Sequence, residues 1–294
     1  VETLAERLRG AGYATAGFAG GRWVTPRFGF DQGFEVWQND ASWEASIQDA
    51  AHRFAPARAW VARRDAARPF FLFVHLYQAH DPYAPPEQYV GRFAPPPADP
   101  QALARPFGEV LPSPEALKAQ VALYDADIRA SDQAIGDFLR WLASEGRADN
   151  TLVVLTSDHG EEFFDHGWTG HGQQYQELIR VPLIWAHPAL ELLGARVVAT
   201  PTPSVDVAPT LLDLVGIAVP DDLPGTSRVS ELVGGQTEGG VAFSGTAHGP
   251  GLRAAAWTDT THLLVQDGVY HLFNANDDPF ETVDLWAPDA PTAA

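Results

Sequence analysis

Three short runs of apolar residues stand out along the chain and predict strands. Residues 69–77 (PFFLFVHLY), 151–156 (TLVVLT) and 181–185 (VPLIW) show little alternation between apolar and polar positions. Strands buried on both faces have this pattern, because neither face meets water. Residues 13–18 read as a further short strand. The runs predict an α/β fold in which helices sandwich a mixed, largely parallel sheet.

Segments with helical spacing separate the strands. Residues 3–6 (TLAE) have the form of a capping box, so a short helix should begin there and end at Gly10. A second helix is predicted over 43–64, interrupted at Pro56. The sequence Ser-Pro-Glu opens a third, long helix over 113–146. Its apolar residues recur at helical spacing.

The pattern changes toward the C-terminus. Asp206 is expected to cap a short helix that ends at Gly216. Beyond about residue 236, glycines separate short strands at 254–257, 262–265 and 270–273, which suggest a small antiparallel sheet. We therefore predict two parts: an α/β domain over 1–235 and a small C-terminal subdomain over 236–294. A proline-rich loop over 81–114 holds ten of the 24 prolines.

Charge and composition narrow the function. The net charge is −19, which argues against nucleic acid or an anionic membrane as partner. Apolar residues make up 45% of the chain, enough for a sizeable core, and no apolar run is long enough to predict a transmembrane segment. There is no cysteine, so thiolate chemistry and disulfides are excluded within this stretch. The chain also lacks methionine and begins with Val1, so we interpret it as a fragment or a processed chain.

Ser157-Asp158-His159-Gly160 follows the strand 151–156 directly. Ligands of open α/β sheets bind beyond the carboxyl ends of strands. An Asp–His pair at such a place offers a carboxylate oxygen and an imidazole nitrogen to a divalent cation. Gly160 would let the backbone turn sharply beside it. The structural alternative is that Asp158 caps the next helix and His159 faces solvent.

Histidines are concentrated after this motif. His159, His166 and His171 fall within 13 residues, although the whole chain has only ten histidines. Histidines on a glycine-rich loop can converge on an anion or on a leaving group. A solvated polar loop is the alternative. His80 follows the strand 69–77 in the sequence Gln-Ala-His-Asp-Pro-Tyr, whereas His75 inside that strand reads as a core residue.

Taken together, these segments resemble the sulfatases of the alkaline-phosphatase-like superfamily. The resemblance rests on an ordered set of motifs that covers nearly the whole chain. They are TLAERLRGAGYATAGF, GFD at 29–31, PFFLFVHLYQAHDPYAPP, YDADIRASDQAIG, LTSDHGEEFFDHGWTGHG with YQELIRVPLIW, DVAPTLL at 206–212, and the late YHLF, DP and Glu281. Each motif alone is weak, and the order makes the set specific.

The resemblance implies a site and an activity. It places metal ligands on Asp158 and His159, an anion-contacting histidine on His80, and the family's basic residue, usually Lys or His, on His171. The implied reaction is metal-dependent hydrolysis of a sulfate ester of a small molecule or glycan. One divalent ion is implied, usually Ca²⁺, with Mn²⁺ or Zn²⁺ open because imidazole suits softer ions. The resemblance implies the same fold as the patterns do, with a smaller C-terminal sheet.

One departure from the family is informative. In sulfatases the nucleophile is a formylglycine, which is made from Cys or Ser within a C/S-x-P-x-R motif. This nucleophile and the family's first acidic metal-binding pair lie upstream of the helix that matches TLAE in this chain. This chain contains no such motif. We therefore expect this chain, expressed alone, to have no sulfatase activity and to bind metal poorly. The compartment stays open, with a periplasmic or extracellular location as the expectation.

Three alternatives remain at this point. A phosphoester or phosphonate hydrolase, or a phospho-transferase, of the same superfamily would keep the fold and change the substrate. A non-catalytic relative would bind a sulfated or phosphorylated glycan without cleaving it. An acidic scaffold domain would have incidental histidines and bind no divalent ion.

Overall fold

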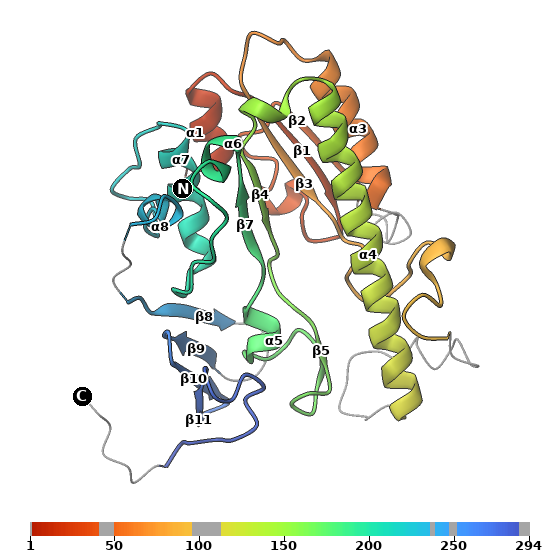
Figure 1. The fold of residues 1–294 in the computed structure, drawn as a ribbon, viewed down its shortest axis with the longest axis vertical. Coiled ribbons are helices and arrows are strands. Elements are labelled where there is room, and N and C mark those ends of the chain that lie inside the picture. The colour runs from red at the N-terminus through yellow and green to blue at the C-terminus, as the bar shows by residue number, and fades with distance from the viewer. Residues whose placement is uncertain (1, 41–49, 96–112, 236–238, 247–251, 288–294) are drawn as a thin grey trace. The chain divides into compact units, whose positions relative to one another are not determined.

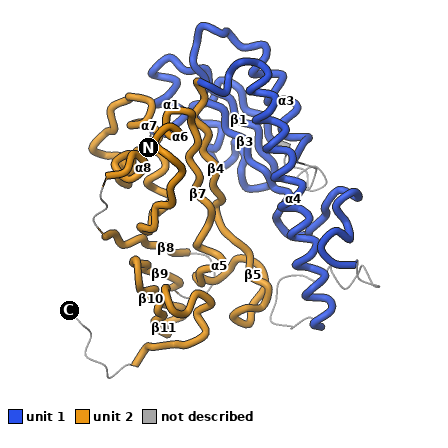
Figure 2. Tube along the Cα trace, in the orientation of Figure 1, with its two compact units in different colours: residues 1–149 blue, residues 150–294 orange. Residues whose placement is uncertain are grey.

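The computed structural model describes residues 2–40, 50–95, 113–235, 239–246 and 252–287. The predicted helical residues 43–49 and most of the proline-rich loop, 96–112, lie outside these ranges. The chain divides into two compact units, residues 1–149 and 150–294 (Figure 2). The boundary predicted near residue 236 falls inside the second unit and stays a prediction.

The first unit is built on a parallel sheet of three strands in the order β2-β1-β3 (Figure 1). The strands are β1 (Ala14–Gly20), β2 (Val36–Asp40) and β3 (Phe70–His75). Every residue of β1 is buried, because it lies in the middle of the sheet and is covered on both faces. The sequence predicted β1 and β3 and missed β2.

Two long helices cover one face of this sheet. They are α3 (Ala50–Arg63) and α4 (Pro114–Ser144), and Phe54 of α3 stacks on Phe138 of α4 at 4.8 Å between ring centroids. Phe18 of β1 joins the same core. Burial of this aromatic and aliphatic surface is the main stabilising contribution in the unit.

The opposite face of the sheet is packed with aromatic side chains. Trp37 stacks on Phe73 of β3, and Phe34 contacts both of them. A Cβ atom at Gly17 of β1 would lie 2.3 Å from the ring of Trp37, so only glycine lets the indole lie this close to the strand. The small residue in β1 therefore makes room for the large one in β2.

The helix ends follow the predicted signals with two exceptions. Helix α1 (Leu4–Gly10) has its capping box, in which the Thr3 side chain accepts from Glu6 N and Glu6 accepts from Thr3 N. Helix α4 is capped by Ser113. The predicted interruption at Pro56 is wrong, since α3 continues through it. The second exception is the predicted cap at Asp206, which lies in the second unit and is described with it below.

The second unit begins with an antiparallel pair of strands, β4 (Val153–Thr156) and β7 (Leu183–Ala186). Short elements follow them. They are β5 (Glu162–Phe163), β6 (Thr169–Gly170), α5 (Gln176–Ile179), α6 (Pro188–Glu191), α7 (Val207–Leu214) and α8 (Val229–Leu232). Asp206 precedes α7 but makes no side-chain cap, because its carboxylate instead accepts from Arg228 Nε at 2.6 Å and Thr226 N at 2.8 Å.

A four-stranded antiparallel sheet ends the chain, as the glycine-punctuated pattern predicted. Its strands are β8 (Ala242–Thr246), β9 (Arg253–Trp257), β10 (Thr261–Gln266) and β11 (Val269–Asn274), in the order β11-β10-β9-β8. The mixed α/β architecture with a parallel sheet and a small C-terminal antiparallel sheet is confirmed.

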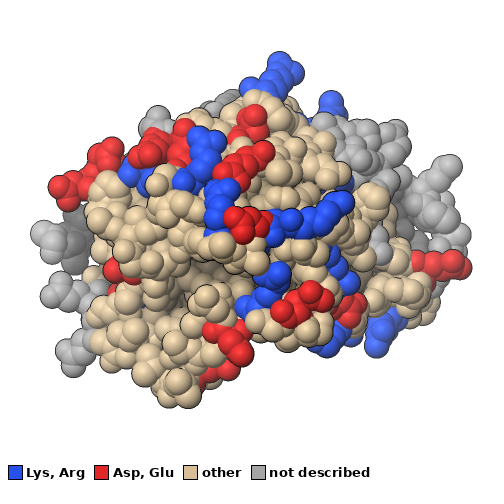
Figure 3. Space-filling view, turned by 90° about the horizontal axis from the view of Figure 1, so that it is seen from above, with Lys and Arg blue, Asp and Glu red and all other residues tan. Residues whose placement is uncertain are grey.

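Among the described residues, no helix is both long and apolar enough to span a membrane. On the face drawn in Figure 3, basic side chains lie intermixed with acidic ones. Arg68 and Glu35 form one close ion pair of the first unit, at 2.8 Å.

Candidate functional site

The loop after β4 orients His159 through its own backbone. His159 Nδ1 donates to the Gly160 carbonyl at 2.8 Å, so Nδ1 carries a proton. In the neutral ring Nε2 then carries the lone pair, and a nitrogen in this form can bind a metal ion. Ser157 Oγ donates to the His159 carbonyl at 2.7 Å and holds the turn from the other side.

Asp158 completes a pair of donor atoms. Its Oδ2 lies 3.9 Å from His159 Nε2, and its side chain is 75% exposed, so the carboxylate is accessible to an ion. Its Oδ1 accepts from the His159 backbone N at 3.2 Å. A carboxylate oxygen and an imidazole nitrogen on the same side of one turn suit a divalent cation. The donor set therefore fits the implied metal.

Gly160 has a different role from the one expected. Its backbone is not in the left-handed region, but a Cβ atom there would lie 1.9 Å from the Glu177 carbonyl oxygen. Gly160 N donates to the Leu178 carbonyl at 2.7 Å. Glycine is therefore required for close approach to α5, rather than for a sharp turn.

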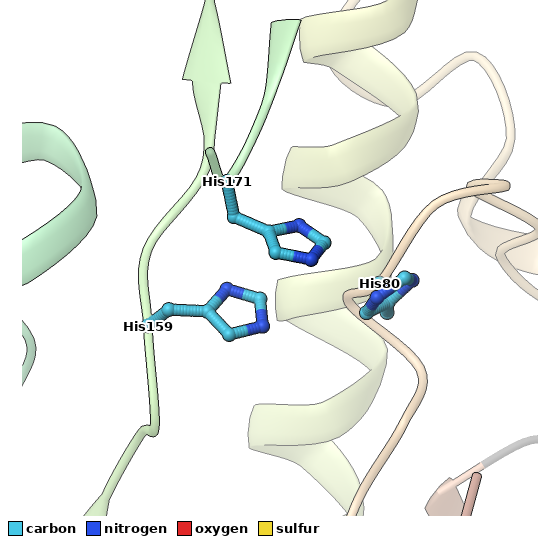
Figure 4. A group of neighbouring side chains, drawn as sticks. All are labelled: His80, His159 and His171. Carbon is cyan, nitrogen blue, oxygen red and sulfur yellow. The ribbon is translucent and has the colours of Figure 1, made fainter. Parts of the chain in front are cut away.

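His171 lies beside His159, as the histidine-rich loop suggested. The two rings stack with centroids 4.1 Å apart and planes within 17° of parallel (Figure 4). His171 Nδ1 lies 4.0 Å from Glu161 Oε1, and the Glu161 side chain is 3% exposed. The buried carboxylate of Glu161 therefore lies close to the ring of His171. Glu161 is a residue that sequence reasoning did not single out.

His166, the third histidine of the loop, has its partners elsewhere. Its Nδ1 bonds Glu177 Oε1 at 2.6 Å, its Nε2 donates to the Glu281 carbonyl at 3.3 Å, and its ring stacks on Tyr175 at 3.6 Å. Burial lowers the pKa of His166, but the bond to Glu177 and its charge outweigh burial and raise that pKa overall. His166 is therefore a structural residue of the loop.

The C-terminal sheet fastens the segment that follows His171. Arg253 of β9 donates to the Gly172 carbonyl, and Ser244 of β8 donates to the Gln174 side chain. Tyr175 packs against the core of the sheet, where Phe273 is buried. These contacts fix the backbone on the C-terminal side of His171.

Glu281 is buried and makes hydrogen bonds to both the C-terminal sheet and this segment. Its Oε1 bonds His262 Nδ1, with both side chains fully buried, and its Oε2 accepts from Gln176 N at 3.0 Å. The family landmark at Glu281 thus joins the C-terminal sheet to the start of α5. No local pattern in the sequence pointed to His262.

Glu162 is a buried acid within the same loop. It is 1% exposed, and burial together with the charge of Glu177 raises its pKa to about 8. The group is therefore largely protonated at neutral pH. The neighbouring Glu177 keeps its hydrogen bond to His166.

His80 belongs to the first unit and follows the carboxyl end of β3. Its Nδ1 donates to the Asp81 carbonyl at 2.6 Å, and its ring stacks on Tyr77 at 4.4 Å (Figure 4 labels His80). Burial raises the pKa of Asp81, and the charge of His80 offsets part of that rise. His75 Nδ1 donates to the Gly20 carbonyl at 3.0 Å, so the predicted hydrogen-bond partner is present, but the residue is only partly buried.

Comparisons with known proteins agree with the motifs. A family model described as Sulfatase matches residues 1–217. The arylsulfatase of Clostridium perfringens is 29% identical over 252 residues, which cover 77% of this chain and 51% of that protein. The N-acetylglucosamine-6-O-sulfatase of Bacteroides thetaiotaomicron is 40% identical over 104 residues, which cover 35% of this chain and 18% of that protein.

Solved structures show the same fold. The phosphonate monoester hydrolase of Agrobacterium radiobacter aligns with a TM-score of 0.77 at 24% identity, over 98% of this chain and 76% of that chain. A protein solved in complex with its substrate D-glucosamine-2-N,6-O-disulfate aligns with a TM-score of 0.72 at 22% identity, over 96% of this chain and 77% of that chain. This chain spans about half the length of the arylsulfatase and a smaller share of the glucosamine sulfatase. With the family model matching most of its residues, the chain belongs to the sulfatase family.

Proposed function

We propose that the protein hydrolyses sulfate esters, and that Asp158 and His159 supply two of the ligands of a divalent cation. The single observation that carries the proposal is the loop after β4. It sets Asp158 Oδ2 3.9 Å from His159 Nε2 and stacks His171 on the same imidazole. A bound cation there would neutralise charge on the ester oxygens. Ca²⁺ is our first candidate, and the His ligand keeps Mn²⁺ and Zn²⁺ in the test.

His80 holds a sulfate oxygen in this proposal, and the state of its ring follows from its hydrogen bond. Because Nδ1 already donates to the Asp81 carbonyl, Nε2 can donate to an anion only when the ring is protonated. In this proposal the protonated form of the His80 ring is the one that binds a sulfate oxygen. His159 has the same local bond with the opposite use, since metal binding needs its Nε2 unprotonated.

His171 stabilises or protonates the leaving oxygen in this proposal. Glu161 Oε1 lies 4.0 Å from His171 Nδ1, and the His171 side chain is 34% exposed, so a substrate can reach part of the ring. A sulfated sugar and an aryl sulfate are both candidate substrates. The names of the two sulfatases compared above support these two classes.

The test is activity and metal content of the full-length gene product. Hydrolysis of 4-nitrophenyl sulfate and of glucosamine 6-sulfate is measured beside 4-nitrophenyl phenylphosphonate, each with added Ca²⁺, Mn²⁺ or Zn²⁺. We expect a sulfate ester to be the preferred substrate. A higher kcat/KM for the phosphonate would replace the proposal with phosphonate hydrolysis, and binding without turnover would replace it with a non-catalytic relative.

Metal content tests the proposed ligands directly. We expect Asp158→Ala to lose most of the bound divalent ion, because one of two charged or lone-pair donors on the loop is gone. Asp149→Ala is the matched control, since this aspartate is exposed and precedes β4. Elemental analysis after gel filtration makes the comparison. Equal metal in Asp158→Ala and the unaltered protein would remove Asp158 from the ligand set.

A further inference from the structure

A buried aspartate in helix α4 contacts both ends of the loop that carries His80. Asp127 is fully buried, and its two carboxylate oxygens have different partners. Oδ1 accepts from Gln78 Nε2 at 3.0 Å, and Oδ2 accepts from the backbone N of Ala84 at 3.0 Å. His80 lies between these two residues in the sequence. One side chain therefore clamps the entry and the exit of the loop.

The clamp is anchored on two helices of the first unit. Gln78 is itself buried, and its Oε1 accepts from Ala50 N at the start of α3 at 2.6 Å. Asp127 comes from α4, which packs against α3 across the aromatic core. The loop is thus tied to both helices through one amide and one carboxylate. Side chains locked by such partners hold a site to the tolerance that catalysis needs.

Inside the loop, the orientation of His80 follows from the backbone that the clamp holds. His80 N donates to the Tyr77 carbonyl at 3.1 Å, and its Nδ1 donates to the Asp81 carbonyl at 2.6 Å. Both contacts use backbone atoms between Tyr77 and Ala84. A shift of the loop at either end would therefore move the imidazole. A displacement of about 1 Å in a substrate-positioning group can cost on the order of 10²-fold in rate.

Burial of Asp127 is energetically unfavourable for its charged carboxylate. Burial raises its pKa to about 7, while the bonds from Gln78 and Ala84 act in the opposite direction. An apolar residue at this place in α4 would pack without that cost. Groups kept in unfavourable surroundings are concentrated at functional sites.

We infer that Asp127 is a positioning residue that holds His80 in the orientation required to bind the sulfate group. The inference rests on the proposed role of His80. Its basis is independent, because Gln78, Ala84 and Asp127 all lie in the first unit and their hydrogen bonds are given by the structure. Asp127 does not touch substrate in this inference and acts through the loop.

The first experiment is a double-mutant cycle on the full-length protein with 4-nitrophenyl sulfate. Asp127→Asn keeps the size of the side chain and removes one of its two acceptor oxygens. We expect kcat/KM to fall about 10-fold or more, mainly through a higher KM, and Asp132→Asn to have no effect. Asp132 lies in the same helix but is exposed in an ion pair with Arg129. In a His80→Ala background, Asp127→Asn should then cause no further loss.

The second experiment observes the environment of His80 by NMR and does not depend on an activity assay. The imidazole carbon–proton resonance of His80 is assigned as the one that His80→Ala removes. We expect it to shift in Asp127→Asn, while the resonance of the exposed His52 on α3 stays unchanged. A shift at His80 supports positioning even if His80→Ala turns out to be fully active, an outcome that would contradict only the proposed function.

Two outcomes would overturn the inference. One is an unchanged His80 resonance together with an unchanged kcat/KM in Asp127→Asn. The other is an equal loss of kcat/KM in the unaltered and His80→Ala backgrounds, which indicates general destabilisation. If Asp127→Asn does not fold, Gln78→Met removes one of the two bonds and leaves the carboxylate in place. We expect it to show the same pattern with a smaller amplitude.

Discussion

At the scale of single residues, the proposed function gives opposite roles to two histidines that make the same kind of hydrogen bond. His80 and His159 each donate from Nδ1 to a nearby backbone carbonyl, so the proposed role of each ring falls to Nε2. A metal ligand needs that nitrogen unprotonated, and an anion donor needs it protonated.

The first residue-scale prediction concerns His171. We expect His171→Ala to lower kcat on the order of 10²–10⁴-fold, because the group near the leaving oxygen is lost. The free energy of unfolding should change by only about 0.5 kcal/mol, since the ring is partly exposed and flanked by glycines. Kinetics and thermal unfolding of the full-length variant check both. A large fall in Tm alongside the rate would show a structural residue instead.

The second residue-scale prediction concerns Glu162. Its pKa is about 8 in the folded state and near 4.5 when unfolded, so the folded protein binds this proton more tightly. Its contribution to stability is complete below about pH 4.5 and is lost as pH rises toward 8. Glu162→Gln does not titrate and should be more stable than the unaltered protein at pH 9 but similar at pH 5.

Chemical denaturation at both pH values measures that difference. The exposed Glu145→Gln is the control and should follow the unaltered protein at each pH. A single titrating group changes the free energy of unfolding by at most about 1.4 kcal/mol per pH unit. Identical pH profiles for Glu162→Gln and the unaltered protein would mean that the raised pKa is absent.

At the scale of elements, the clearest lesson is that helix α3 continues through Pro56. The ring removes one backbone hydrogen bond, yet Phe54, Ala57 and Val61 on either side of it are buried in the core of the sheet. Packing of these side chains outweighs the local cost. Sequence signals for helix ends therefore held for α1 and α4, where local caps decide, and failed in α3, where tertiary burial decides.

The element-scale prediction follows. We expect Pro56→Ala to raise the free energy of unfolding by about 2 kcal/mol, because the helix regains a hydrogen bond and loses a steric conflict. Pro188→Ala is the matched control, since that proline opens α6, where no bond is missing. Denaturant titration compares the two. A stability for Pro56→Ala at or below that of the unaltered protein would show that the ring itself packs favourably.

The sequence predicted site residues that lie in local motifs and missed those that depend on tertiary contacts. The sequence pointed to Asp158, His159 and His171, because they sit in one motif, and the structure does bring the two histidines together. Asp127 lies within the motif YDADIRASDQAIG, but the motif did not reveal its contacts, which appear only when the loop at 78–84 folds against α4. For residues that act through distant contacts, the local pattern does not show the role.

At the scale of the whole chain, residues far apart in sequence meet within the second unit. Glu281 bonds His262 in full burial, and its carbonyl accepts from His166, 115 residues earlier. Breaking a buried pair leaves an uncompensated partner. We expect Glu281→Gln to lower the free energy of unfolding by about 3 kcal/mol.

Asp259→Asn, in the exposed turn between β9 and β10, is the control for that change. Urea unfolding followed by tryptophan fluorescence measures both variants. We also expect Glu281→Gln to increase proteolytic cleavage in the loop 160–175, since the Glu281 carboxylate accepts from Gln176 N directly after this loop. Unchanged stability and cleavage would mean that the sheet and the loop are independent.

The link between His166 and Glu281 also sets an order of events during synthesis. A ribosome adds roughly 5–20 residues per second, so the 115 residues between these two partners take on the order of ten seconds to emerge. Throughout that time the histidine-bearing loop is outside the ribosome without the sheet that fastens it. The proposed catalytic loop is therefore among the last parts of the second unit to take its final form, and a chain released before residue 281 would lack its fastening.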